Sequence, residues 1–231
     1  MNIIVNGGTR GIGKEIVMLL AKDKKNRILV MGRTASVLTR LSSGAKNRNI
    51  STFMTDLAVF DKNQQAFLKA VTLVMKNVDI LINTAGSLVV KEFMKFSNDK
   101  AREMMETNFF GPASVIRAVQ PMMKKGSHIV NISSMGGFQG SSKYKGLSYY
   151  SASKAAISSL SECLAGEFRD SGVAVNCLAL GSVQTEMFED AFPGHKAPVS
   201  AMEMAQFIVD FALKGNKFFN GKVLPVAVSN P

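Results

Sequence analysis

The stretch "NGGTRGIGKEI", residues 6–16, decides how this chain folds. It follows the apolar run at residues 3–5, and apolar residues then recur at helical spacing from Glu15 onward. Gly7, Gly11 and Gly13 therefore stand between an expected strand and an expected helix, at a spacing related to the dinucleotide-binding fingerprint. Glycines there allow a tight turn and let the backbone approach a pyrophosphate at the positive end of the helix. Taken alone, the motif is also compatible with a structural turn that binds nothing.

Short apolar runs alternate with helical patterns along the rest of the chain. The expected strands are residues 3–5, 28–31, 50–54, 78–82, 128–132, 173–180 and 223–228, and helical spacing recurs at 15–21, 66–75 and 157–168. Because parallel strands need crossover connections, this alternation predicts an α/β fold with a parallel sheet covered on both faces. The chain has 231 residues, 46% of them hydrophobic, and no linker-like composition break, so we expect a single domain over residues 1–231.

Composition excludes several classes of protein. No signal peptide or membrane-spanning run is evident, and we expect a cytoplasmic protein with neither a membrane nor a nucleic acid as its partner. Cys163 and Cys177 lie in no metal-binding pattern, so we expect two reduced, buried thiols and no metal site. The net charge is +11, but the basic residues are scattered. The densest run, residues 22–27, is interpreted as a solvated helix end, and no nucleic-acid-binding motif is present.

The second expected strand indicates which nucleotide the glycine loop would bind. In this kind of fold, an NAD-binding chain usually has an acid at the end of that strand to bond the ribose 2′-hydroxyl. Here the strand ends with Gly32 and Arg33, and Arg10 lies inside the glycine loop. Guanidinium groups suit a 2′-phosphate because they neutralise its charge with paired donors. The sequence therefore favours NADP(H) over NAD(H).

Several short motifs occur together in a familiar order. They are "NGGTRGIG" at 6–13, "TDL" at 55–57, "NTAG" at 83–86, "TNFFG" at 107–111, "HIVNISSMGG" at 128–137 and "YSASK" at 150–154. In this order the chain resembles a short-chain dehydrogenase/reductase over nearly all of its length, with a 3-oxoacyl carrier-protein reductase as one candidate branch. The resemblance implies a doubly wound Rossmann fold with a seven-stranded parallel sheet in the order 3-2-1-4-5-6-7. It also implies a homodimer or homotetramer packed through the helices that begin near Asp99 and Tyr150, where the apolar and small residues are Met104, Met105, Ala156 and Leu160.

The family's Y-x-x-x-K pattern selects Tyr150 with Lys154 and leaves Tyr149 for packing. On a helix, residues four apart share a face, so the ammonium would lie beside the phenol and lower its pKa. Tyr150 is then the expected general acid/base. The resemblance also implies that Ser134 bonds the substrate oxygen, with Ser133 as the second choice, and that Asn108 holds a water linked to Lys154.

The resemblance assigns further residues to the cofactor. Lys154 would bond the nicotinamide ribose, Asp56 and Leu57 would flank the adenine, and Val183 and Thr185 would meet the carboxamide. The complete expected cofactor set is Gly7, Thr9, Arg10, Gly11, Ile12, Gly13, Arg33, Asp56, Leu57, Asn83, Ala85, Gly86, Tyr150, Lys154, Val183 and Thr185.

Three departures from the family pattern lie on the substrate side. Leu180 stands where the family has a proline, residues 135–149 are longer than usual, and the segment after Thr185 is short. The leading hypothesis is NADPH-dependent reduction of a carbonyl to a secondary alcohol, or the reverse. The alternatives are a non-catalytic regulator that senses NADP(H) and, from the charge alone, a nucleic-acid-binding protein. The substrate stays open: an acyl chain on an acidic acyl carrier protein or a free ketone, sugar or steroid would each be compatible.

Overall fold

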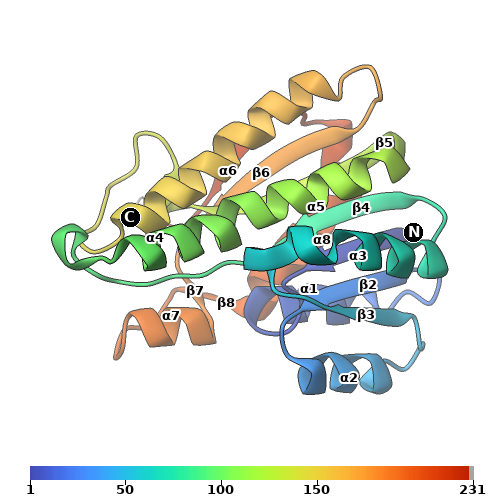
Figure 1. Cartoon of the computed structure of the whole chain (residues 1–231), viewed down its shortest axis with the longest axis horizontal. Helices are drawn as coiled ribbons and strands as arrows, with labels where there is room; N and C mark the ends of the chain where they lie inside the picture. The colour runs from blue at the N-terminus through green and yellow to red at the C-terminus, as the bar shows by residue number, and fades with distance from the viewer. Residues whose placement is uncertain (229–231) are drawn as a thin grey trace.

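The computed structural model describes residues 1–228, and seven parallel strands form its central sheet (Figure 1). The strands lie in the order β3-β2-β1-β4-β5-β6-β9, which confirms the predicted order with β9 as the seventh strand. Their bounds are β1 Asn2–Asn6, β2 Arg27–Gly32, β3 Ile50–Met54, β4 Val78–Asn83, β5 Met123–Ser134, β6 Ala174–Leu180 and β9 Val223–Val226. Two short strands, β7 Val183–Gln184 and β8 Val199–Ser200, pair separately with each other.

Helices cover both faces of the sheet. One face is covered by α1 (Gly11–Leu20), α2 (Ala35–Gly44) and α8 (Ala201–Lys214), and the other by α3 (Phe60–Val74), α5 (Gly111–Val119) and α6 (Ser148–Glu167). The remaining helices are α4 (Asn98–Met105) and α7 (Glu186–Ala191). Shorter helical turns are η1 (Leu57–Val59), η2 (Phe93–Lys95), η3 (Glu106–Phe110), η4 (Gln120–Met122), η5 (Met135–Gly137) and η6 (Gly215–Lys217).

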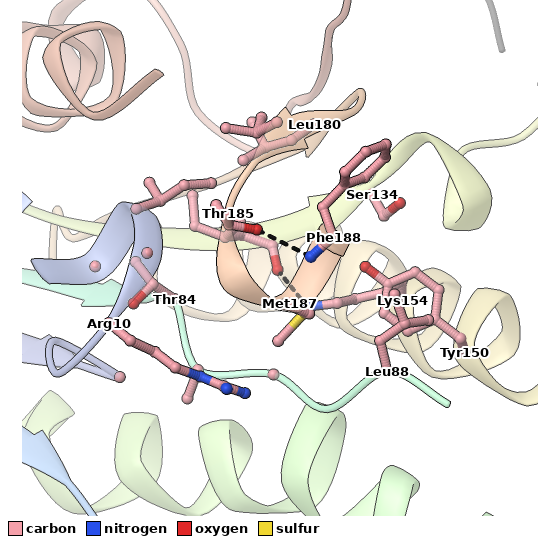
Figure 2. A pocket seen from close by; sticks show the side chains of 18 of the residues that line it. Arg10, Thr84, Leu88, Ser134, Tyr150, Lys154, Leu180, Thr185, Met187 and Phe188 are labelled. Atoms are coloured by element: carbon pink, nitrogen blue, oxygen red, sulfur yellow. Dashed lines mark hydrogen bonds between the residues drawn. The ribbon is translucent and has the colours of Figure 1, made fainter. Parts of the chain in front are cut away.

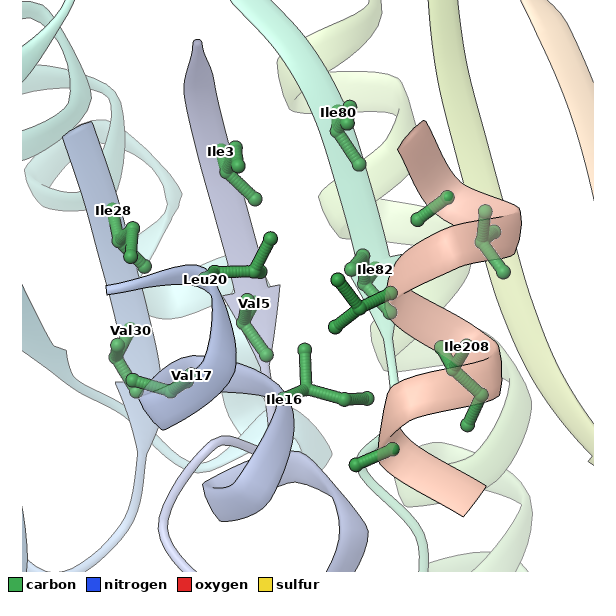
Figure 3. Packing of buried hydrophobic residues seen from close by; sticks show 14 of the residues in the cluster. Ile3, Val5, Ile16, Val17, Leu20, Ile28, Val30, Ile80, Ile82 and Ile208 are labelled. Carbon is green, nitrogen blue, oxygen red and sulfur yellow. The ribbon is translucent and has the colours of Figure 1, made fainter. Parts of the chain in front are cut away.

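The two-residue period of the strands divides the core between the two faces. In β1, Ile3 and Val5 are buried against α1 and α8, whereas Ile4 between them is buried against the α3 and α5 side. Figure 3 shows the first of these layers, with Ile16 of α1 and Ile208 of α8 above the strands. Each fully buried isoleucine contributes about 1.5–3 kcal/mol relative to an exposed one. This double burial explains why the strand sequences are continuous apolar runs.

The sheet topology determines where a ligand can bind. Strand order reverses at β1, whose neighbours are β2 on one side and β4 on the other. In open α/β sheets, the crevice beyond the carboxyl ends of the strands at such a reversal is the usual ligand site. The glycine loop follows β1 at this point.

The structure corrects three expectations from the sequence. Cys163 is exposed because it lies on the solvent face of α6, and only Cys177 is buried. Met104 is buried within the protomer, so it cannot supply an oligomer contact as expected, whereas Met105, Ala156 and Leu160 remain partly exposed. The seventh strand ends at Val226, two residues before the expected end at residue 228.

Across residues 1–228, no helix is long and apolar enough to cross a membrane. Within the same residues, no three or more histidine, cysteine, aspartate or glutamate side chains are grouped closely enough to hold a metal ion.

Candidate active site

A cleft of about 710 Å³ lies beyond the carboxyl ends of the strands, at the reversal point. Most of the predicted site residues line it: Gly7, Thr9, Arg10, Gly11, Ile12, Gly13, Arg33, Asp56, Leu57, Ala85, Gly86, Ser134, Tyr150, Lys154, Val183 and Thr185. In Figure 2, Arg10 and Thr84 lie at one end of the cleft, whereas Ser134, Tyr150 and Lys154 lie together at the other. The cleft thus has two ends with different chemistry.

The glycine loop is packed too closely to accept side chains. Gly7 has φ +87°, and a Cβ there would lie 2.5 Å from the backbone nitrogen of Ala85. A Cβ on Gly13 would lie 2.2 Å from the carbonyl oxygen of Gly7. These contacts hold the N-terminus of α1 at the floor of the cleft, where its free N–H groups and positive dipole favour a phosphate. The residues present therefore fit a dinucleotide pyrophosphate.

The end of the cleft near β2 and β3 is basic and open. The Arg33 guanidinium lies 3.9 Å from the Asp56 carboxylate, and both side chains are largely solvent-exposed. Arg10 is also exposed at the edge of the loop. A Cβ on Gly32, where an NAD-binding chain usually has its acid, would lie 2.3 Å from the Thr9 side-chain methyl, so a side chain there would require Thr9 to move.

At the other end, the structure distinguishes the two serines that end β5. The Ser133 hydroxyl is buried, donates to the Lys154 carbonyl at 2.7 Å and accepts from Ser158 at 2.9 Å. The Ser134 hydroxyl accepts from the Gly136 backbone at 3.1 Å, bonds the Tyr150 phenol and is partly exposed in the cleft. Of the two, Ser134 is the one free to contact a substrate oxygen.

Tyr150 and Lys154 lie one turn apart on α6, as the spacing predicted. The Lys154 ammonium lies 5.9 Å from the centre of the Tyr150 ring and donates to the Ile132 carbonyl at 3.0 Å. Tyr149 points elsewhere and packs on Phe93 and Phe96, with ring centroids 5.4 and 4.9 Å apart. The prediction that Tyr149 is a packing residue is therefore confirmed.

The charge states differ from the expectation. Burial raises the pKa of the Tyr150 phenol, and the hydrogen bond with Ser134 opposes this rise only in part. Burial also lowers the pKa of Lys154 to about 8, and the neighbouring Cys177 thiol opposes that fall. The direction is thus opposite to the expected lowering, because desolvation by burial is the largest influence on the Tyr150 phenol.

Asn108 lies in η3, a π-helical stretch that joins α4 to α5. Its Oδ1 accepts from the Ser87 backbone at 2.7 Å, and its Nδ2 donates to the Ser87 carbonyl and to Ser153, each at 2.9 Å. Ser153 in turn donates to the Tyr150 carbonyl at 2.7 Å. Asn108 thus ties the loop after β4 to the helix that carries Tyr150. Oδ1 keeps one lone pair, so the predicted water-holding role stays a prediction.

Asn83 lies beneath the cleft and does not line it. Its side chain accepts from Asn6 at 3.2 Å and donates to Asn131 at 2.8 Å, and Asn131 donates to Ser161 on α6 at 2.9 Å. This buried row crosses β1, β4 and β5 at matching register positions. Any effect of Asn83 on a cofactor would therefore act through the positions of these strands.

Comparison with known proteins places this geometry in a family. Residues 1–196 match the family model described as short chain dehydrogenase. The chain belongs to the short chain dehydrogenase family. It is therefore an oxidoreductase of this family, whose members use nicotinamide cofactors and are typically oligomeric.

The individual relatives have low sequence identity to this chain but match it over most of its length. An uncharacterized oxidoreductase of Staphylococcus epidermidis is 29% identical over 208 residues, covering 89% of this chain and 88% of the relative. The 3-oxoacyl-(acyl-carrier-protein) reductase of Chlamydia trachomatis is 28% identical over 239 residues, covering 96% and 94%. A short chain dehydrogenase of Burkholderia cenocepacia, solved in complex with NADP, has a TM-score of 0.87 at 23% identity, covering 97% and 95%.

Sequence reasoning missed several residues of this short chain dehydrogenase. Ser153, inside "YSASK", links Asn108 to α6, and its position on the buried face of that helix was the available signal. Gly137 lets η5 approach α6, since a Cβ there would lie 2.5 Å from the Ala155 backbone nitrogen. The apolar wall of the cleft near Tyr150 had no motif to mark it. It consists of Leu88, Leu147, Met187, Phe188 and Phe192.

Proposed function

We propose that this protein reduces a carbonyl to a secondary alcohol with NADPH, or catalyses the reverse reaction, with Tyr150 as the general acid/base. The observation that carries the proposal is the arrangement of Ser134, Tyr150 and Lys154 along one cleft that ends at a glycine loop flanked by arginines. Such a cleft can hold a nicotinamide dinucleotide with its reactive end beside a proton donor.

Each polar group at this end has a separate task. When bound, the nicotinamide supplies or accepts the hydride. The Ser134 hydroxyl bonds the carbonyl oxygen, and Tyr150 donates its proton to that oxygen as negative charge develops there. Because burial raises the pKa of Tyr150, the phenol is protonated near neutral pH, and this is the form that reduction requires. Oxidation requires the phenolate and therefore becomes faster at alkaline pH.

Lys154 has a different environment and a different task. It is buried, and none of the ion pairs found within residues 1–228 includes it. Its ammonium would bond the nicotinamide ribose and favour the phenolate electrostatically during oxidation. Gly86 leaves room for this contact, because a Cβ there would lie 3.3 Å from the Lys154 nitrogen.

NADP(H) is the proposed cofactor. Arg10 and Arg33 lie at the end of the cleft where the 2′-phosphate would bind, and Gly32 stands at the usual place of an NAD-binding acid. The Burkholderia cenocepacia structure, which resembles this chain in fold, contains NADP.

The substrate is proposed only as a class, a ketone or 3-oxoacyl compound. The Chlamydia trachomatis relative supports an acyl chain delivered by an acyl carrier protein as one member of this class. The apolar wall formed by Leu88, Leu147, Met187, Phe188 and Phe192 supports a substrate with an aliphatic or aromatic body.

We also propose a homodimer or homotetramer packed through α4 and α6. Light scattering should give the mass of two or four chains, and a monomer at micromolar concentration would reject this assembly.

The deciding experiment is a turnover assay. Purified protein is supplied with NADPH or NADH and a panel of ketones, sugars, steroids and 3-oxoacyl thioesters, and loss of the reduced nicotinamide is followed. We expect NADPH-dependent turnover of at least one apolar ketone. NADPH binding without turnover of any carbonyl in the panel would instead support a non-catalytic sensor.

A further inference from the structure

Apolar side chains project into solvent beside the mouth of the cleft. They are Val90, Phe93, Met94 and Tyr144, called the apolar tip here. Met94 is 89% exposed and Phe93 is 59% exposed. In Figure 1, the segment that precedes α4 and the loop that precedes α6 meet at the left end of the molecule, on the side of α7. Exposed apolar groups of this size at one place usually mark a binding surface.

Two loops form the apolar tip, and specific contacts hold them together. The Lys91 backbone nitrogen donates to the Gly146 carbonyl at 2.9 Å. Lys145 pairs with the Glu92 carboxylate at 3.0 Å, and Lys95 pairs with the same carboxylate at 3.2 Å. The tip is therefore a built surface in which the segment around η2 is bonded to the loop before α6.

Cations surround the apolar tip. Lys91, Lys95, Lys143 and Lys145 are exposed beside it, and Glu92 is the acid among residues 90–95 and 143–146. Four lysines against one glutamate leave three positive charges on this surface. Apolar side chains flanked by lysines match the boundary of an anionic bilayer, where the former enter the acyl region and the latter meet the headgroups.

The apolar tip continues into the substrate end of the cleft. Tyr144 and Lys145 belong to the tip region and also line the cleft, and Leu88 and Leu147 extend the apolar surface inward. A hydrophobic molecule leaving a lipid surface at the tip could reach Tyr150 along apolar side chains.

We propose that the apolar tip docks on an anionic lipid surface and that the cleft takes an apolar carbonyl substrate from that surface. This docking departs from the expectation, drawn from the sequence, that no membrane is a partner. It is independent of the proposed reductase function, whereas the supply of substrate rests on that function. A second copy of this chain fits less well, because a two-fold contact would place these lysines against their own copies. An acidic protein also fits less well, because a side chain as exposed as Met94 offers no groove for partner side chains, whereas fluid acyl chains adapt to any shape.

The first experiment is co-sedimentation of the intact protein with vesicles. Vesicles of phosphatidylcholine alone are compared with vesicles that also contain phosphatidylglycerol. We expect binding to the anionic vesicles only. Met94→Ser should weaken it roughly ten-fold, because the bound protein would no longer insert this apolar side chain into the acyl region. Lys91→Glu should weaken it roughly thirty-fold, because two units of charge change near the anionic surface.

Matched control variants test whether the effect is local. Leu73→Ser removes a side chain that is 88% exposed on α3, and Lys24→Glu makes the same charge change in the turn between α1 and β2. Both controls should bind vesicles within two-fold or so of the unaltered protein. Docking through the tip would be rejected if Met94→Ser and Leu73→Ser lost vesicle binding equally, or if neither substitution changed vesicle binding. If Met94→Ser instead reduces the mass measured by light scattering, the tip is an interface between copies of this chain.

The second experiment tests the supply of substrate. Turnover of a long-chain ketone dissolved in anionic vesicles should fall in Met94→Ser, whereas turnover of a short, water-soluble ketone should be unchanged. Equal turnover of the vesicle-borne ketone by both proteins would reject delivery from the lipid surface. Vesicle binding without turnover of any ketone would reject the reductase function and leave the docking intact.

Discussion

Two buried basic side chains lie along β5, one in the middle of the strand and one beyond its carboxyl end, and their surroundings differ. His128, in the middle of the strand, donates from Nδ1 to the Ala212 carbonyl and accepts at Nε2 from Asn176, each at 3.0 Å. Lys154, beyond the carboxyl end, donates to the Ile132 carbonyl at 3.0 Å and also faces the cleft. Burial lowers both pKa values, that of His128 to about 4 and that of Lys154 to about 8.

The difference lies in which hydrogen-bonding positions remain free. Asn176 donates to the Phe219 carbonyl and accepts from the Lys222 backbone nitrogen, so its orientation is fixed and its amide must donate to His128. A neutral imidazole then satisfies every hydrogen-bonding partner. In a protonated imidazole, the Nε2 proton would face the donating amide of Asn176. The Lys154 ammonium, in contrast, keeps donors for a ligand in the cleft. We infer that the closed cluster serves stability and the open one serves chemistry.

Replacing Tyr150 gives the largest expected effect. Tyr150→Phe keeps the ring but removes the hydroxyl that titrates, so turnover should fall by roughly 10²–10⁴-fold, as for loss of a general acid. NADPH binding, measured by fluorescence titration, should persist. Tyr149→Phe is the matched control, because this ring packs on Phe93 and Phe96 and its turnover should change only slightly.

The two tyrosine variants can contradict the assignment in different ways. A dead Tyr149→Phe beside an active Tyr150→Phe would mean that the wrong residue of α6 has been assigned. Two active variants would mean that neither phenol is the proton donor.

Lys154 should make cofactor use dependent on pH. Its pKa of about 8 means that the ammonium is present below that pH and is lost as the pH rises through it. We expect kcat/KM for NADPH to fall about ten-fold per pH unit above the pKa, because this ratio reports the free enzyme. Lys154→Met should show weak NADPH binding at every pH and no such transition. A flat wild-type profile between pH 7 and 9.5 or so would show that the charge of Lys154 is not needed.

Much of the fold could be predicted because strands buried on both faces have continuous apolar sequences. The apolar runs located the strands, but β5 begins at Met123, five residues before the predicted start at His128. Lys124, Lys125 and Gly126 in this extension are exposed, and β5 shifts register against β4 between Val78 and Ile80. Hydrophobic periodicity cannot detect a polar, irregularly paired strand end.

The site could be predicted as far as the motifs reached. Neighbouring residues on a strand point to opposite faces, so one of Ser133 and Ser134 had to be turned from the cleft, but only the packed structure shows which. The direction of the Tyr150 pKa shift depends on how much water the folded chain excludes, which spacing does not reveal. The exposure of Cys163 depends on which face of α6 meets the sheet.

The closed cluster around His128 should be visible as pH-dependent stability. The pKa of His128 falls from 6.5 to about 4 on folding, so the unfolded chain binds the extra proton between these values. The free energy of unfolding that this cluster contributes is fully present above pH 6.5 and is lost as the pH falls toward 4. The shift corresponds to about 3 kcal/mol. Urea unfolding at several pH values should show this loss. In His128→Gln, the free energy of unfolding should fall less steeply between pH 6.5 and 4. If the free energy of unfolding depended on pH equally in the unaltered protein and in His128→Gln, another group would be responsible for the loss of stability in acid.

Arg33 offers a third environment, an exposed charge at the far end of the cleft, and gives the smallest expected effect. Its guanidinium is free to leave the Asp56 carboxylate, because the pair is 3.9 Å long and solvent-exposed, and such pairs contribute little. A 2′-phosphate offers stronger, paired hydrogen bonds. Arg33→Ala should therefore weaken NADPH binding by roughly 10- to 100-fold, the worth of hydrogen bonds to a charged group, and leave NADH binding nearly unchanged. The measurement is titration of both cofactors, with Arg40→Ala on α2 as a control that removes an exposed arginine outside the cleft lining. Equal losses for NADPH and NADH would show that Arg33 does not read the 2′-phosphate, and the preference would then have to come from Arg10.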